Sequence, residues 1–261
     1  KIEIEVEKVI SNMKIIGLVN VQLAYVNNNV YLLEVNPRAS RTIPFVSKAL
    51  GIPLARIAAK IMAGKSLKDL KFQEIPSLEG FFVKEAVMPF NKFQNVDPIL
   101  GPEMRSTGEV MGIGNSFAEA FEKAEVGAGV EIPKKGSVFI SVRDTDKQFL
   151  SEIVPSLVEQ DFNLFATKGT ASVIKNMGFK VSQIKKVIEG RPNIVDLMKN
   201  KEVNLVINTT EGRESILDSA SIRRTALDEK ICCTTTIKGA KAICEVITKK
   251  VDWSYRKLQD I

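Results

Sequence analysis

Hydrophobic positions recur with helical spacing in some stretches of the chain and form strand-like runs in others. Near residue 134, the order in which predicted helices and strands follow one another changes. Before that point, Asn27-Asn28-Asn29 separates two strand-like runs and predicts a hairpin. Ser116 and Glu119 predict a capped helix that begins at Phe117. The other elements expected there are helices over 2–16, 43–50 and 53–62 and strands over 18–26, 30–35 and 80–87.

After residue 134, strand-like and helical segments alternate, which predicts a parallel sheet covered by helices on both faces. Ligands of such sheets bind at the carboxyl ends of the strands. We therefore expect two domains, 1–134 and 135–261, in a mixed α/β and α+β protein. The expected strands are 137–142, 162–166, 179–184, 203–208 and 231–235, and the expected helices are 146–160, 170–177, 194–199, 214–227 and 240–247.

Composition limits the kinds of ligand and metal that the chain can bind. The 37 basic and 31 acidic residues give a net charge of +6 but are dispersed, which favours a solvated surface and small phosphorylated ligands over nucleic acid. The absence of histidine removes the commonest general base and transition-metal ligand, so any metal should be a hard cation held by oxygen. Cys232, Cys233 and Cys244 form no CxxC pair, which indicates reduced thiols in the cytoplasm. We expect neither a membrane span nor a signal peptide.

The predicted hairpin offers oxygen ligands on one face. Glu34 and Asn36 share a face of their strand, and a turn centred on Asn28 places Gln22 opposite Glu34. Such a set suits a magnesium ion that bridges nucleotide phosphates. Arg38 and Arg41 follow as candidate phosphate clamps. Spacing alone favours the alternative, an exposed polar face with surface salt bridges.

A second candidate site lies where a strand ends and a helix begins. Gly169 allows a tight turn there, and Thr167 and Thr170 offer hydroxyls beside helix N-terminal amides, which suits a phosphate. Simple capping of the helix by Thr170 is the alternative. Further polar residues at neighbouring strand ends favour a shared phosphate site: Lys186, Asn208, Thr209 and Thr210.

The run over 34–49, EVNPRASRTIPFVSKA, resembles the ATP-grasp signature of the large subunit of carbamoyl phosphate synthetases, and runs over 54–66 and 89–112 resemble the same family. The passage into an alternating tail resembles the second synthetase half, which phosphorylates carbamate. The resemblance implies Mg2+ or Mn2+ bound by Gln22, Glu34 and Asn36, and Arg38 and Arg41 as catalytic residues facing the phosphates of the substrate ATP.

What the resemblance implies for the intact enzyme is wider. That enzyme makes carbamoyl phosphate from bicarbonate, glutamine-derived ammonia and two ATP, together with a small glutamine amidotransferase subunit, for pyrimidine and arginine synthesis. Neither nucleic acid nor a membrane is an expected partner, and homo-oligomer formation stays open.

The tail resembles the methylglyoxal-synthase-like, Rossmann-like allosteric domain of the same family, in runs such as Lys186 to Pro192 (KVIEGRP) and Ile207 to Thr210 (INTT). The resemblance implies an effector site for uridine monophosphate (UMP) or inosine monophosphate (IMP), formed by Ser141, Lys147, Thr167, Thr170, Lys186, Asn208, Thr209 and Thr210. It also places Glu85 and Thr235 by an ornithine-type effector. The family has tyrosine where this chain has Cys233, which leaves the ornithine response open.

Only 16 residues precede the hairpin, whereas an ATP-grasp fold needs an earlier subdomain with nucleotide-binding lysines. We therefore expect a fragment that does not turn over ATP alone. Two other enzyme functions are disfavoured. Methylglyoxal synthase itself needs a catalytic histidine, which this chain lacks, and a biotin carboxylase lacks the alternating strand-helix tail found after residue 134. A stand-alone nucleotide-sensing module without catalysis is the alternative that stays open.

Overall fold

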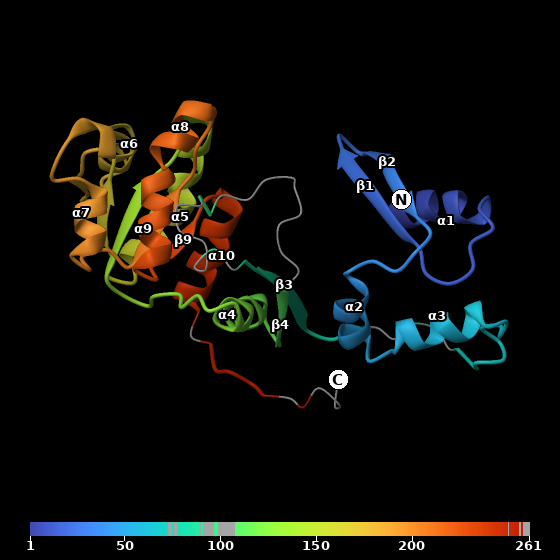
Figure 1. The fold of residues 1–261 in the computed structure, drawn as a ribbon. Coiled ribbons are helices and arrows are strands. Elements are labelled where there is room, and N and C mark those ends of the chain that lie inside the picture. The colour runs from blue at the N-terminus through green and yellow to red at the C-terminus, as the bar shows by residue number, and fades with distance from the viewer. Residues whose placement is uncertain are drawn as a thin grey trace. The chain divides into compact units, whose positions relative to one another are not determined.

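The computed structural model describes residues 1–72, 75, 78–88, 90, 97–98, 108–249, 251–255 and 257, with the side chains of 213 and 214 left out. The chain forms two compact units, which Figure 1 draws as ribbons: Lys1–Glu79 with Tyr255–Ile261, and Gly80–Ser254. Within the described residues, no helix combines the length and apolar character needed to cross a membrane.

The first unit contains the predicted hairpin and its flanking helices. Helix α1 stops at Ser11, short of the expected end at residue 16, because the Asn12 side-chain amide donates to the Lys8 carbonyl at 2.7 Å and closes the last turn. Helix α2 has the predicted bounds and ends at Gly51, whose φ of 66° favours glycine. The elements are α1 (Ile2–Ser11), β1 (Asn20–Val26), β2 (Asn29–Asn36), α2 (Ile43–Leu50) and α3 (Leu54–Met62).

The second unit begins with an antiparallel pair, β3 (Phe81–Val87) and β4 (Gly108–Gly114), against which α4 (Phe117–Gly127) packs. The predicted cap is confirmed: Ser116 Oγ accepts from the Glu119 amide at 3.2 Å. Strand β4 was not predicted, because its glycines lower β propensity. The glycines are needed since a Cβ at Gly112 would lie 1.9 Å from the Ala120 carbonyl oxygen of α4.

The predicted five-stranded parallel sheet is confirmed, with strand order β7-β6-β5-β8-β9. The order reverses direction beside β5, so the carboxyl ends of β5 and β8 flank a switch point of the kind where α/β proteins bind ligands. The strands are β5 (Ser137–Ser141), β6 (Asn163–Ala166), β7 (Ser182–Gln183), β8 (Leu205–Asn208) and β9 (Cys232–Thr234). The helices are α5 (Leu150–Val158), α6 (Lys168–Asn176), α7 (Ile194–Lys199), α8 (Arg213–Asp218), α9 (Ala220–Asp228) and α10 (Ile237–Thr248), with 3-10 helices η2 (Asp144–Phe149) and η3 (Val187–Glu189).

Besides β4, two further elements of this unit differ from prediction. The strand expected over 179–184 is reduced to Ser182–Gln183, because Phe179 and Val181 pack against the core instead of pairing along β6. The single helix expected over 214–227 breaks at Ser219 into α8 and α9. The sequence period continues through the break, so the apolar pattern gave no sign of it.

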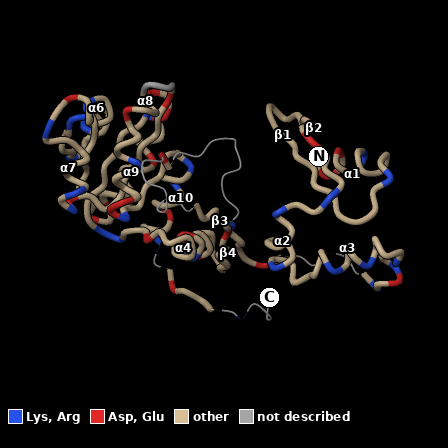
Figure 2. The backbone as a smooth tube through the Cα atoms, viewed as in Figure 1, with Lys and Arg blue, Asp and Glu red and all other residues tan. Residues whose placement is uncertain are grey.

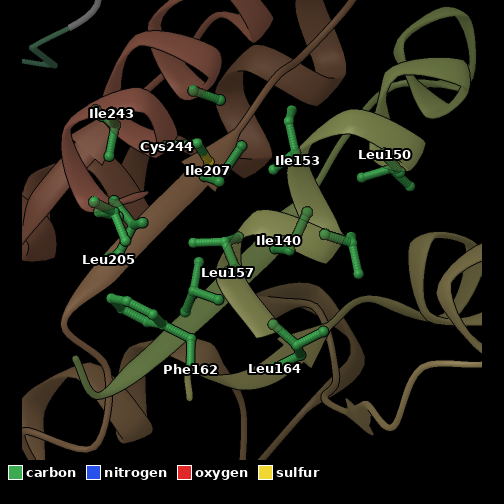
Figure 3. Packing of buried hydrophobic residues seen from close by; sticks show 14 of the residues in the cluster. Ile140, Leu150, Ile153, Leu157, Phe162, Leu164, Leu205, Ile207, Ile243 and Cys244 are labelled. Carbon is green, nitrogen blue, oxygen red and sulfur yellow. The ribbon is translucent and has the colours of Figure 1, made fainter. Parts of the chain in front are cut away.

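Apolar side chains fill both faces of the sheet. On one face, Ile140 and Ile207 meet Leu157 of α5 (Figure 3), and on the other Phe139 and Val206 belong to a cluster with residues of α7 and α9. The two neighbouring thiols follow the same division, since Cys232 belongs to the first cluster and Cys233 packs against the second. All three cysteines are free, and burial raises the pKa of Cys233 and of Cys244 to about 12.

The first core cluster also includes Ala118 of α4 and Ile132. The β3–β4–α4 segment therefore belongs to the same compact unit as the sheet, although it precedes the expected domain boundary. The division into domains 1–134 and 135–261 stays a prediction.

Candidate functional site

A cavity of about 540 Å³ opens at the carboxyl edge of the sheet, a volume typical of sites for small molecules. Residues at the ends of β5, β6 and β8 line it, together with the starts of η2 and α6 and the corner between α8 and α9. Its lining includes Ser141, Arg143, Asp144, Lys147, Thr167, Gly169, Thr170, Lys186, Val187, Ile188, Asn208, Thr209, Glu211, Ser215, Asp218, Ser219 and Ile222.

Hydroxyl groups from different strand ends meet in this cavity. Ser141 Oγ lies 3.2 Å from Thr167 Oγ1, and the Val142 amide donates to Thr170 Oγ1 at 3.3 Å. Thr209 Oγ1 accepts from the Arg143 amide at 3.1 Å. All three threonines are buried, and backbone amides fix the Thr170 and Thr209 hydroxyls, which can still donate a proton to a ligand.

Asn208 contributes a donor that lacks an acceptor. Its side chain is 1% exposed, and its Nδ2 has no hydrogen-bond partner among the residues that the structure describes. A buried donor without a partner costs about 1–3 kcal/mol, so an acceptor on a ligand would offset that cost.

Positive charge gathers at the start of α6. A Cβ built on Gly169 would lie 3.1 Å from Lys147 Nζ, which shows that the ammonium group sits over the first turn of the helix. The helix N-terminus adds its own positive end. Lys147 is held from the far side by Asp144, at 2.6 Å from Nζ to Oδ1. This combination favours an anionic group beside Gly169.

Arg143 at the rim is oriented by a buried partner. Its Nε donates to Asp146 Oδ2 at 2.8 Å, and Asp146 is 6% exposed. The hydrogen bond and the charge of this carboxylate raise the pKa of Arg143. In Figure 2, Lys, Arg, Asp and Glu are otherwise distributed along the whole tube, in agreement with a solvated surface.

Seven of the eight effector-site residues predicted from sequence line the cavity, and Thr210 is not among its lining residues. Sequence reasoning missed the wall formed by α8 and α9. The apolar period continues through that stretch, so the available signal was the presence of the short polar residues Ser215, Asp218 and Ser219, whose side chains compete for backbone hydrogen bonds.

In the hairpin, Gln22 pairs with Glu34 as predicted, but the turn and the strand register that produce this pairing differ from the prediction. The turn is formed by Asn27 and Asn28, with φ of 48° and 63°, and not by a turn centred on Asn28. An irregularity beyond Gln22 restores the predicted pairing, because Leu23 pairs with Leu32 and leaves one extra residue on β2.

The predicted ligand atoms therefore share one face of the hairpin. Asn36 Nδ2 donates to Glu34 Oε1, and Gln22 and Glu34 are exposed. Arg38 and Arg41, just beyond β2, are exposed too, and Arg38 Nη1 donates to the Ala39 carbonyl at 3.1 Å. One carboxylate with two amide oxygens fits a hard cation such as Mg2+ that keeps further ligands from water or phosphate.

The candidate ornithine-type residues lie in different elements. Glu85 is half-buried in β3 opposite Val110, and burial raises its pKa. Burial, with the charge of Glu85, also raises the pKa of Glu125 on α4 to about 7. Thr235 is exposed, just beyond the end of β9.

Comparisons with known proteins find relatives of both parts of the chain. A family model described as the carbamoyl-phosphate synthase L chain, ATP binding domain, matches residues 1–70, and one described as the MGS-like domain matches 150–235. Carbamoyl phosphate synthase large chains of Pseudomonas aeruginosa and Pseudomonas putida are each 54% identical, over 98% and 100% of this chain. The chain is a homologue of the C-terminal part of the carbamoyl phosphate synthase large chain.

The large chain of Vibrio parahaemolyticus is 48% identical over 100% of this chain. The chain spans 24% of the length of these large chains. A methylglyoxal synthase from Elizabethkingia anophelis NUHP1 aligns with a TM-score of 0.37 at 16% identity, over 43% of this chain and 79% of that one.

Proposed function

We propose that the cavity binds a nucleoside monophosphate, UMP or IMP, as an allosteric effector of a carbamoyl phosphate synthase large chain. The observation that carries the proposal is the buried Asn208 amide without a partner among the described residues, in a cavity that is also lined by three threonines and by Lys147 over the start of α6. A phosphate fits the end with Lys147 and Gly169. The sugar and base then face the wall that contains Asp218 and Ile222.

Lys186 and Thr210 complete the proposed set. Lys186 lines the cavity and supplies a further positive charge toward the ligand. Thr210 follows Thr209 directly, and its role in binding rests on the family resemblance alone.

Isothermal titration of the 261-residue chain with UMP, and in parallel with uridine, tests this proposal. We expect UMP to bind and uridine, which lacks the phosphate, to bind at least about tenfold more weakly, because charge-assisted hydrogen bonds to phosphate are the strong ones. Equal heats for the two ligands, or none for UMP at millimolar concentration, would contradict it.

For the hairpin, we propose the metal end of an ATP-dependent ligase site in the whole protein. Gln22, Glu34 and Asn36 would hold Mg2+ or Mn2+, which would neutralise nucleotide phosphates when bound, and Arg38 and Arg41 would face those phosphates. The whole protein would be a cytoplasmic enzyme that makes carbamoyl phosphate from bicarbonate, ammonia and ATP with a glutamine amidotransferase subunit. Glu85 and Thr235 stay proposed as part of an amine effector site.

Glu34→Gln tests the metal proposal directly. Glu34 is the single carboxylate of the proposed ligand set, so its loss should weaken Mn2+ binding by about tenfold or more, a scale seen even for groups that only support metal ligands. Electron paramagnetic resonance of Mn2+ in the presence of ATP measures the change. Glu3→Gln on exposed α1 is the matched control, and equal Mn2+ binding by the two variants would remove Glu34 from the site.

A stand-alone sensing module is the second candidate. It is favoured by the described cavity, which lies wholly within the unit Gly80–Ser254. UMP binding without any ATP turnover by this chain is the result that it predicts.

A further inference from the structure

An ion pair between a buried arginine and a half-buried aspartate joins two parts of the second unit that are distant in sequence. Arg223 of α9 is 2% exposed, and its Nε and Nη2 donate to the two carboxylate oxygens of Asp97 at 2.8 and 2.5 Å. Asp97 lies in the sequence between β3 and β4, and 126 positions separate it from Arg223. Such two-point pairing fixes both position and orientation of the guanidinium group.

The same guanidinium group also holds the corner between α8 and α9. Arg223 Nη2 donates to the Ile216 carbonyl of α8 at 2.6 Å, across the break at Ser219. The Arg223 amide donates to the Ser219 carbonyl at 3.1 Å. The geometry of this corner therefore depends on where the Arg223 side chain is held.

This corner is a wall of the cavity. Ser215, Asp218, Ser219 and Ile222 line it, and each lies within one turn of a residue that Arg223 bonds. Ile222 also belongs, with Ala226, to the core cluster that includes Phe139 of β5 and Val206 of β8. Since packed interiors transmit small shifts instead of absorbing them, movement of the wall must move the guanidinium group.

We propose that Arg223 is a positioning residue that links the wall of the cavity to the chain between β3 and β4, so that ligand binding and the Asp97 pair strengthen each other. The link rests in part on the proposed nucleotide site. By thermodynamic reciprocity, a ligand that strengthens the Asp97 pair must bind more weakly, by the same factor, when the pair is lost.

The test uses Asp97→Asn in the 261-residue chain, with Asp228→Asn as matched control. Asp228 is on the same helix but pairs with Arg224 at 2.9 Å and is half exposed. Hydrogen exchange of the 213–228 amides is measured without ligand. We expect exchange to be at least about threefold faster in Asp97→Asn and unchanged in Asp228→Asn. Equal exchange in Asp97→Asn and the unsubstituted chain would overturn the link.

UMP titration of the same proteins is the second arm. We expect Asp97→Asn to lower UMP affinity by about fivefold, the lower end of common coupling factors, and Asp228→Asn to leave it unchanged. Unchanged affinity in Asp97→Asn would also overturn the link. If the unsubstituted chain fails to bind UMP, the proposed nucleotide site is wrong, and the exchange arm alone decides whether the link exists.

Asp97→Asn leaves a buried charge without its partner and can unfold the chain. The double variant Asp97→Asn with Arg223→Met removes both charges, a change that folded proteins commonly tolerate. We expect it to show the same loss of UMP affinity, and retained affinity would overturn the link.

Discussion

At the scale of single residues, ligand binding in the cavity depends on buried polar side chains that are in place before a ligand arrives. Thr170 accepts from the Val142 amide and is 1% exposed, so its hydroxyl is held in one place before a ligand arrives. Asn208 is equally buried, and its Nδ2 has no acceptor among the described residues. Pre-organised donors of this kind save the entropy of ordering them on binding.

Thr170→Ala should therefore weaken UMP binding by about 1–2 kcal/mol, the scale of a lost hydrogen bond to a charged group, or roughly 5–30-fold in affinity. Calorimetric titration measures it. Thr248→Ala is the control, because its hydroxyl donates within α10 to the Cys244 carbonyl at 2.9 Å, and Thr248 does not line the cavity. Unchanged affinity in Thr170→Ala would remove this residue from the site.

At the scale of elements, helices and strands with a regular apolar period could be predicted from sequence, whereas elements shaped by tertiary packing could not. Apolar spacing and turn residues predicted the bounds of α2. They also predicted that the parallel sheet has five strands, although not the length of each strand. Strand β4 was missed because its glycines serve the packing of α4, a tertiary reason with no local signal. The α8–α9 wall was missed because the apolar period continues through the break between the two helices and because the Arg223–Asp97 pair that holds the wall spans 126 positions.

Gly112→Ala tests the close approach of α4 to β4. The added Cβ would lie 1.9 Å from the Ala120 carbonyl oxygen and 2.7 Å from the Ala124 amide nitrogen, both backbone atoms. We expect a loss of about 2–3 kcal/mol in the free energy of unfolding, near the upper end for overpacking. Urea denaturation measures it.

Gly127→Ala, at the end of α4, provides the contrast for Gly112→Ala. Its Cβ would make an ordinary contact of 3.4 Å with Val110. This change should leave stability equal or slightly higher, because alanine favours helix. Equal stability of the two variants would show that α4 does not pack on β4 as described.

At the scale of the whole unit, the chain near its C-terminal end is tied to α4 by buried carboxylates. Glu119 Oε1 accepts from Ser254 Oγ at 2.6 Å and from Lys123 Nζ at 2.7 Å, and Trp253 Nε1 donates to Glu122 at 3.0 Å. Burial alone would raise the pKa of Glu119, but the hydrogen bonds from Lys123, Ser254 and Asn115 outweigh it and lower the pKa from 4.5 to about 2.

The sign of this shift predicts acid sensitivity. Glu119 binds protons less readily folded than unfolded, so its stabilisation is present above pH 4.5 and is lost as the pH falls toward 2. Glu119→Gln should lower stability at pH 7 and flatten its decline between pH 4.5 and 2. Urea denaturation at each pH, followed by fluorescence of Trp253, the sole tryptophan, measures this.

Glu152→Gln is the control for the acid experiment, because Glu152 forms an exposed pair with Lys241. This substitution should change the free energy of unfolding by less than about 0.5 kcal/mol. Parallel pH profiles for Glu119→Gln and the unsubstituted chain would contradict the assignment of the tie to Glu119.

The central claim is that a nucleoside monophosphate binds at the carboxyl edge of the parallel sheet. Amide chemical shifts in nuclear magnetic resonance spectra, recorded as UMP is added, test it most directly. The account predicts that the largest shifts occur at Val142, Gly169, Thr170 and Asn208, which surround the proposed phosphate position. Shifts concentrated instead around Gly178 to Ser182, at a different cavity beside β6, or no shifts at saturating UMP, would contradict it.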